Sequence, residues 1–112
     1  MLTYKQMQKE MLLMIDKIRD AQTDELFKAI LSLNDIEECY KFFDDLCTIK
    51  ELQAISQRFA VARMLSQKQV YSDIVEKTGA STATISRVNR SLIYGNDGYK
   101  MIFERLYNDG VQ

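Results

Sequence analysis

The stretch QVYSDIVEKTGASTATISRVNRSL, residues 69–92, decides the fold of this chain. Its residues predict a short helix, a tight turn and a second helix. Gly79 stands at the turn, because glycine adopts the positive φ of a chain reversal at little steric cost. Ser81 follows and offers its hydroxyl as the N-cap of the second helix. The stretch therefore predicts a helix-turn-helix.

The second helix of this stretch has two different faces. Ile85, Val88 and Leu92 are spaced i, i+3, i+7 and share one face, which predicts packing on the preceding helices. The remaining positions carry hydroxyls, a methyl group and two guanidinium groups, and no acid: Thr82, Ala83, Thr84, Ser86, Arg87 and Arg90. Such a face suits the DNA major groove, where Arg reads guanine, Ser and Thr reach bases or phosphates, and Ala meets a thymine methyl. A polar helix-turn-helix used only for packing is the alternative interpretation.

The segments TGASTATISRVNRSL (78–92) and YGNDGYKMIFERL (94–106) resemble the Trp-repressor superfamily, and within it the YerC/YecD group. The similarity is strongest over residues 51–106, about half of the chain. It implies an all-α, intertwined homodimer whose helix-turn-helix binds double-stranded operator DNA, with the docking geometry of the Trp repressor itself. We expect the DNA contacts to come from Lys68, Lys77, Ser81, Thr82, Ala83, Thr84, Ser86, Arg87 and Arg90.

The resemblance also implies a candidate effector pocket between the helix-turn-helix and the dimer core. Its residues are Arg87 and Ser91, which align without a gap, Thr48 and Arg58, which align if one residue is lost before the turn, and Val88. Arg58 can instead be a structural or phosphate-contacting arginine.

Val88 stands where the tryptophan-binding members of the family have glycine. Overpacking a tight site costs about 1–3 kcal/mol, and each 1.4 kcal/mol is about tenfold in affinity. We therefore expect weak or no tryptophan binding, and no other small-molecule effector is identified. Our hypothesis is that Val88 permanently props the second helix outward; the alternative is that it is an ordinary core residue.

Length and composition predict one helical domain. The chain has 112 residues, no proline and four glycines, which favours helices over strands. We expect about six helices: dimerisation and core helices over 1–66, the helix-turn-helix over 67–94 and a C-terminal helix over 99–109, with a frayed tail from Gly110. Met7, Met11, Met14, Ile15 and Ile18 form an apolar stripe that predicts a dimer interface.

Local signals place the boundaries of several helices. Two pairs have capping-box spacing, Thr48 with Glu51 and Asp35 with Glu38. We expect Thr23 to cap the second helix of the chain, which precedes Asp35. Val70 stands where a capping Ser or Thr would be expected. The longest helix should bury a stripe of Ile49, Leu52, Ile55, Phe59, Ala62 and Leu65.

Charge is distributed unevenly along the chain. The net charge is −1, but residues 1–56 carry seven basic and eleven acidic side chains, whereas residues 57–112 carry eight and five. Six basic and only two acidic residues lie between positions 58 and 96. Phosphate binding needs a local basic surface and not a basic protein, so the second half can bind DNA.

Several function classes are disfavoured. The chain has no histidine and two cysteines, Cys39 and Cys47, which predicts reduced thiols and no metal site or cofactor. It has no phosphate-binding glycine loop and no identifiable nucleophile–base pair, so we expect no enzyme. No leader and no apolar run of about eighteen residues occur, so we expect a cytoplasmic protein without a membrane partner. A protein-interaction module with a Trp-repressor-like fold that does not bind DNA specifically remains the alternative, which salt dependence of DNA binding would separate.

Overall fold

A computed structural model describes residues 1–107 of the chain. This part is all-α, as predicted, but contains seven helices where about six were expected. The helices are α1 (Tyr4–Ile18), α2 (Ala21–Leu31), α3 (Ile36–Leu46), α4 (Ile49–Ser66), α5 (Tyr71–Thr78), α6 (Thr82–Tyr94) and α7 (Gly98–Tyr107). The expected number of helices was therefore one too low. Residues 108–109 of the expected C-terminal helix, and the tail from Gly110, lie outside the described residues.

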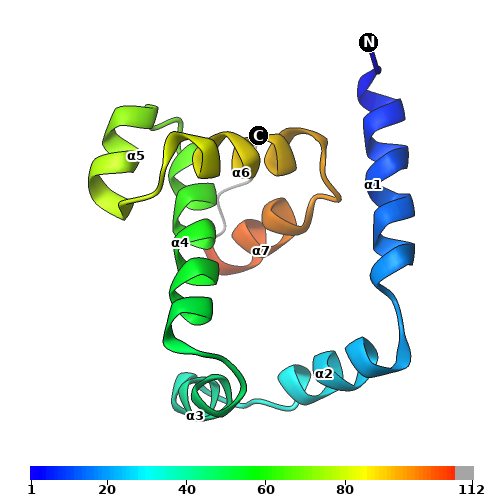
Figure 1. The fold of residues 1–112 in the computed structure, drawn as a ribbon, viewed down its shortest axis with the longest axis vertical. Coiled ribbons are helices and arrows are strands. Elements are labelled where there is room, and N and C mark those ends of the chain that lie inside the picture. The colour runs from blue at the N-terminus through cyan, green and yellow to red at the C-terminus, as the bar shows by residue number, and fades with distance from the viewer. Residues whose placement is uncertain (108–112) are drawn as a thin grey trace.

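The helices α4 to α7 form the body of the chain, and α2 and α3 lead away from it (Figure 1). The helix α1 contacts the body at α6. In Figure 1, α6 crosses the upper end of the long helix α4, and α5 lies beside that crossing. The helix α2 runs along the base of the view to α1, which stands at the opposite side from α4. The core lies where the body helices meet, and its buried residues are Val61, Ala62, Ile74, Ala80, Ile85, Val88 and Phe103.

Helix caps confirm most of the local signals. The Thr48 hydroxyl accepts from the backbone N–H of Glu51, and the Glu51 carboxylate accepts from the backbone N–H of Thr48, which is the predicted capping box. Asp35 caps α3 through the backbone N–H of Glu38. The Glu38 side chain accepts from Asn34 and not from Asp35, so this box is incomplete. Val70 begins α5 without a side-chain cap, as predicted.

One predicted cap was wrong. Asp20, and not Thr23, caps α2: the backbone N–H of Thr23 donates to Asp20 Oδ1 at 2.7 Å. Asp20 has the extended backbone of an N-cap, which lets its carboxylate reach the free N–H group three residues ahead. The helix therefore begins three residues earlier than the sequence suggested.

The apolar stripe of α4 is buried only toward its carboxyl end. Ala62 is fully buried, and Phe59 and Leu65 pack against the core. Ile49 is 73% exposed and Ile55 is 50% exposed, so the expectation that they are buried is wrong for the single chain. The stripe of α1 is divided in the same way, with Met7, Met11 and Ile15 half-buried and Met14 and Ile18 exposed.

Aromatic packing attaches α7 to α4. The Phe103 ring is completely buried, and its centroid lies 5.4 Å from that of Phe59. The Arg63 guanidinium lies over the Tyr107 ring, 3.9 Å from the centroid, and 5.6 Å from the centroid of Phe103. Such cation–π contacts add to the burial of the rings. The end of α4 that supports the helix-turn-helix is thereby held by a helix from the far end of the chain.

Candidate nucleic-acid interface

The turn between α5 and α6 has the predicted geometry. Gly79 has φ of +72°, in the left-handed region that favours glycine, and its N–H donates to the carbonyl of Val75 at 2.8 Å. The Thr78 hydroxyl donates to Ile74 and accepts from the N–H of Ala80. The Gln57 amide on α4 donates to the Thr78 carbonyl at 3.0 Å. The turn is therefore fixed both locally and against the long helix.

The helix α6, called here the reading helix, begins as predicted. Ser81 accepts from the backbone N–H of Thr84 at 3.1 Å, and its hydroxyl lies 3.0 Å from the Thr84 hydroxyl. Ile85 and Val88 are buried in the core, and Leu92 is half-buried. The face predicted to pack is therefore the face that packs.

Five of the predicted DNA-contacting residues form one exposed stripe of the reading helix. At about 100° per residue they lie within an arc of about 140°, roughly opposite the buried pair. They are Thr82, Ala83, Ser86, Arg87 and Arg90, and all are exposed. Thr84 is half-buried and lies outside this arc, bonded to Ser81 at the cap. The stripe projects away from the body and contains no acid.

The cations near this stripe are available for anions. Within the described part of the chain no carboxylate pairs with Arg87 or Arg90. The ion pairs Asp16–Arg19 and Glu25–Lys28 involve residues of α1, of α2 and of the connection between these helices. Lys68 is exposed in the α4–α5 connection, and Lys77 is exposed on α5, where its Nζ donates to Gln69 at 3.2 Å.

Lys68 adopts an unusual backbone conformation. Its φ is +65°, a left-handed value that is strained for a residue with a Cβ. Such strain of about 1–2 kcal/mol per residue persists only where the surrounding structure imposes it. Here the N–H groups of Gln67, Lys68 and Gln69 all donate to carbonyls of the last turn of α4. The connection is thus tightly wound, and Lys68 lies at the entry to the helix-turn-helix.

A cavity of about 200 Å³ lies between α4 and the reading helix. It brings together three of the five predicted effector-pocket residues, Arg58, Arg87 and Val88, with the side chain of Thr84 beside them. Thr48 does not line it, because it caps the far end of α4, ten residues or about 15 Å from Arg58. Ser91 lies elsewhere along the reading helix, and its hydroxyl donates to the Arg87 carbonyl at 3.4 Å.

Sequence reasoning missed two residues of this cavity, Ala54 and Gln57. Ala54 lies four residues before Arg58 and three residues before Gln57, so it shares a face of α4 with each of them, and this spacing is a signal that could have identified the two residues. Val88 is 3% exposed, so its side chain belongs to the core while it also lines the cavity. Both interpretations of Val88, as a residue that props the reading helix outward and as an ordinary core residue, agree with this position.

Residues 1–107 can also be compared with the requirements of a metal site, a disulfide and a membrane span. Among residues 1–107, no group of Cys, Asp and Glu side chains is arranged to hold a metal ion. Cys39 and Cys47 are half-buried free thiols. None of the helices in the described part of the chain is both long and apolar enough to cross a membrane.

Three comparisons with known proteins agree with this geometry. The family model described as Trp repressor protein matches residues 21–107. The uncharacterized protein YerC of Bacillus subtilis strain 168 is 60% identical over 92 residues, which is 82% of this chain and 88% of YerC.

Two solved structures share the fold. One is a TrpR-like protein from Eubacterium eligens, with 62% identity and a TM-score of 0.79 over 81% of this chain and 94% of that protein. The other is a protein from Staphylococcus aureus proposed to be a Trp repressor, with 55% identity and a TM-score of 0.80 over 88% of this chain and 95% of that protein. Since the family model covers well over half of the chain and YerC is similar over most of its length, this chain belongs to the Trp repressor family, in the group of YerC-like proteins.

Proposed function

We propose that this chain is a sequence-specific DNA-binding transcriptional regulator that acts as a homodimer on a palindromic operator. The observation that carries the proposal is the exposed stripe of the reading helix. It combines two guanidinium groups, two hydroxyls and a methyl group, and no carboxylate of residues 1–107 neutralises its arginines. Membership of the Trp repressor family supports a regulator of this kind.

The stripe supports a division of roles among its residues. Arg87 and Arg90 would contact guanine edges or phosphates, and the hydroxyls of Thr82 and Ser86 would reach base edges directly or through water. Lys68 and Lys77, which are exposed in the segments that lead into the reading helix, would contact phosphates and contribute affinity that depends on salt but not on sequence. In a dimer the two reading helices would enter successive major grooves, about 34 Å apart. Repression is the mode that the family suggests.

The exposed apolar area supports the homodimer. The chain has an accessible surface of 8878 Å², whereas a globular monomer of 13.1 kDa exposes about 6,400 Å². An excess of roughly 2,500 Å² is on the scale of the surface that obligate dimers bury. The apolar side chains that contribute to it on α2, α3 and α4 include Leu31 (84% exposed), Ile36 (72%) and Ile49 (73%). A second copy of this chain would cover them.

The test is selection of DNA by the purified protein. Sheared DNA of the source organism is incubated with the protein at about 50 and about 200 mM salt, and the retained fragments are sequenced. A recurring palindrome that survives the higher salt is the expected result. Uniform retention that is lost at the higher salt would reduce the function to non-specific binding. No retention at either salt would favour a protein-interaction module that has kept the fold.

A further inference from the structure

We propose that α1 is a brace that fixes the carboxyl end of the reading helix, with Gln8 as its positioning residue, and that operator recognition depends on this brace. The inference rests on the function proposed above and adds a determinant of specificity to it. The helix α1 precedes the segment that matches the family, which begins at residue 21. The role of α1 is therefore inferred from its own contacts with the body.

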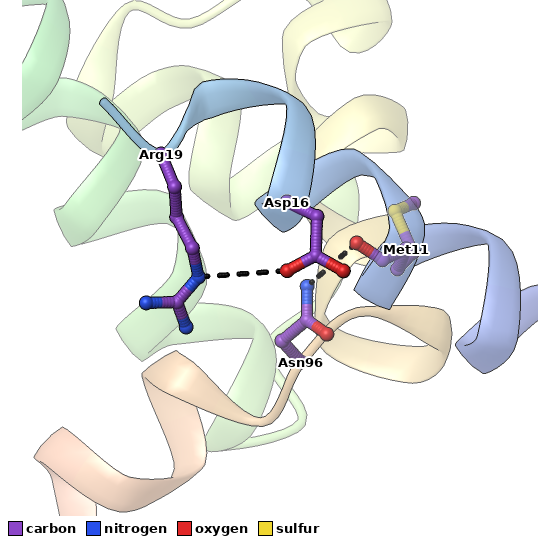
Figure 2. A network of polar contacts seen from close by, with 4 residues as sticks. All are labelled: Met11, Asp16, Arg19 and Asn96. Atoms are coloured by element: carbon purple, nitrogen blue, oxygen red, sulfur yellow. Dashed lines mark hydrogen bonds and ion pairs between the residues drawn. The ribbon is translucent and has the colours of Figure 1, made fainter.

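Two hydrogen bonds join α1 to the turn between the reading helix and α7. Gln8 Nε2 donates to the carbonyl of Gly95 at 2.9 Å, across 87 positions of sequence. Asn96 Nδ2 donates to the carbonyl of Met11 at 3.4 Å, as Figure 2 shows beside the Asp16–Arg19 ion pair of the same helix. The bonds run in opposite directions, from α1 to the turn and from the turn to α1, so each element supplies a donor and an acceptor.

An aromatic contact extends this junction. The rings of Tyr4 and Tyr94 have centroids 6.1 Å apart, within the range of favourable ring pairs. Gln8 Nε2 also donates to the Tyr4 hydroxyl at 3.1 Å, so one amide group joins the ring pair and the Gly95 carbonyl. The half-buried positions of α1 all belong to one stripe that faces this junction: Met7, Gln8, Met11 and Ile15. The remainder of α1 is exposed, so the helix is held to the body along this stripe.

The Gly95 carbonyl is a suitable point for a brace. The final carbonyls of a helix have no partner within the helix, and the last turn of the reading helix has no basic side chain to supply one. The N–H of Gly95 donates to Ser91 at 2.9 Å, and a Cβ at this position would collide with the Ser91 carbonyl. A side chain does not fit this close approach, and the Gly95 carbonyl is held by the donor from Gln8.

The position of this contact lets it orient the reading face. Val88, buried in the core, lies near the middle of the reading helix, about 10 Å from Gly95 and about 9 Å from Thr82. Because the amino end of the helix is held by the turn, a shift at Gly95 would displace the exposed stripe most near Arg90, which lies five residues before Gly95. Base-edge contacts require placement within about 0.5 Å, whereas flexible lysines on phosphates tolerate more. Loss of the brace should therefore reduce specific binding more than non-specific binding.

The test compares Gln8→Ala with Gln8→Met, which keeps the length of the side chain but has no donor. Gln22→Ala is the matched control, because Gln22 is an exposed glutamine on the neighbouring helix α2. Each full-length protein is measured for affinity to a fragment selected by the wild-type chain and to a scrambled fragment of the same length. Amide hydrogen exchange is followed over residues 91–96.

Both Gln8 variants should lose at least fivefold in affinity for the selected fragment and less than twofold for the scrambled one. Exchange should accelerate at residues 91–96 and stay unchanged in α4 and α5, while the control matches the wild type. Unchanged exchange at 91–96 would overturn the proposal, as would faster exchange with an unchanged ratio of the two affinities. If the wild-type chain selects no fragment, the proposed function fails instead, and exchange alone decides whether α1 fixes this end of the helix.

Discussion

Arg58 on α4 and Arg87 on α6 line the same cavity, so the long helix and the reading helix bring two guanidinium groups to one place. The cavity lies directly behind the exposed stripe that we propose to read DNA. Its volume of about 200 Å³ is below the 300–1,000 Å³ or so of most ligand pockets, and Val88 forms part of its wall. A small group that entered it would contact Arg87, which also belongs to the exposed stripe.

Val88 leads to the first prediction. The wild-type chain should show no micromolar binding of L-tryptophan by titration calorimetry, because the valine side chain occupies space beside the two arginines. Val88→Ala should lower the free energy of unfolding by about 2 kcal/mol, measured by urea denaturation, since it removes two buried methyl groups. Micromolar tryptophan binding by the wild type would contradict the first part, and an unchanged stability of the variant would contradict the second.

Lys68 leads to a prediction that separates stability from DNA binding. Lys68→Gly should raise the free energy of unfolding by about 1 kcal/mol, because glycine adopts the left-handed φ without strain, and Lys68→Ala should not. Both variants should bind DNA more weakly and with a smaller dependence on salt, since both lose one phosphate contact. Equal stability of the two variants would argue against strain at this position. Unchanged DNA binding in both would remove Lys68 from the interface.

The exposed end of α4 tests the homodimer. Ile49→Asp should convert the dimer into a monomer or an unfolded chain, because it would bury an unpaired carboxylate in the proposed interface. Light scattering coupled to size exclusion gives the molar mass, and circular dichroism shows whether the helices remain. Lys100→Asp, at an exposed position of α7, is the control and should remain dimeric. A monomeric wild-type protein would refute the proposed assembly.

The capping box of α4 predicts a dependence of stability on pH. The backbone N–H of Thr48, followed by its hydroxyl, lowers the pKa of Glu51 below its ordinary value of 4.5. A carboxyl group with a lowered pKa in the folded state stabilises the protein above pH 4.5, and this contribution is lost as the pH falls through the folded pKa. Glu51→Gln should make the decline of Tm below about pH 4.5 less steep. Glu10 is exposed on α1, and the control variant Glu10→Gln should show the same decline of Tm as the wild type. Identical acid limbs for the wild type and Glu51→Gln would contradict the assignment.

Local chemistry made much of this structure predictable. Gly79 and Ser81 determine the turn and the start of the reading helix through contacts within four residues, which the sequence displays directly. Thr48 and Glu51 mark α4 in the same way. The cap of α2 was missed because Asp20 and Thr23 are both acceptable caps by residue type, and only the backbone conformation distinguishes them.

Contacts between distant residues were not predictable. Nothing in the sequence around Gln8 indicates that it meets Gly95, because the pairing depends on where α2 turns α1 relative to the body. The exposure of Ile49 was missed for a related reason. An apolar stripe shows that a helix face will be covered, but it does not show whether the cover comes from the same chain or from another.

The most direct test of the central claim is a hydroxyl-radical footprint on a fragment that the wild-type protein selects. Two reading helices of one dimer should protect two patches on one face of the duplex, about 34 Å apart. Arg87→Ala should abolish both patches, because it removes from the exposed stripe a guanidinium that no carboxylate of residues 1–107 pairs with. A single patch, or two patches that survive Arg87→Ala, would contradict the claim that a dimer reads its operator through α6.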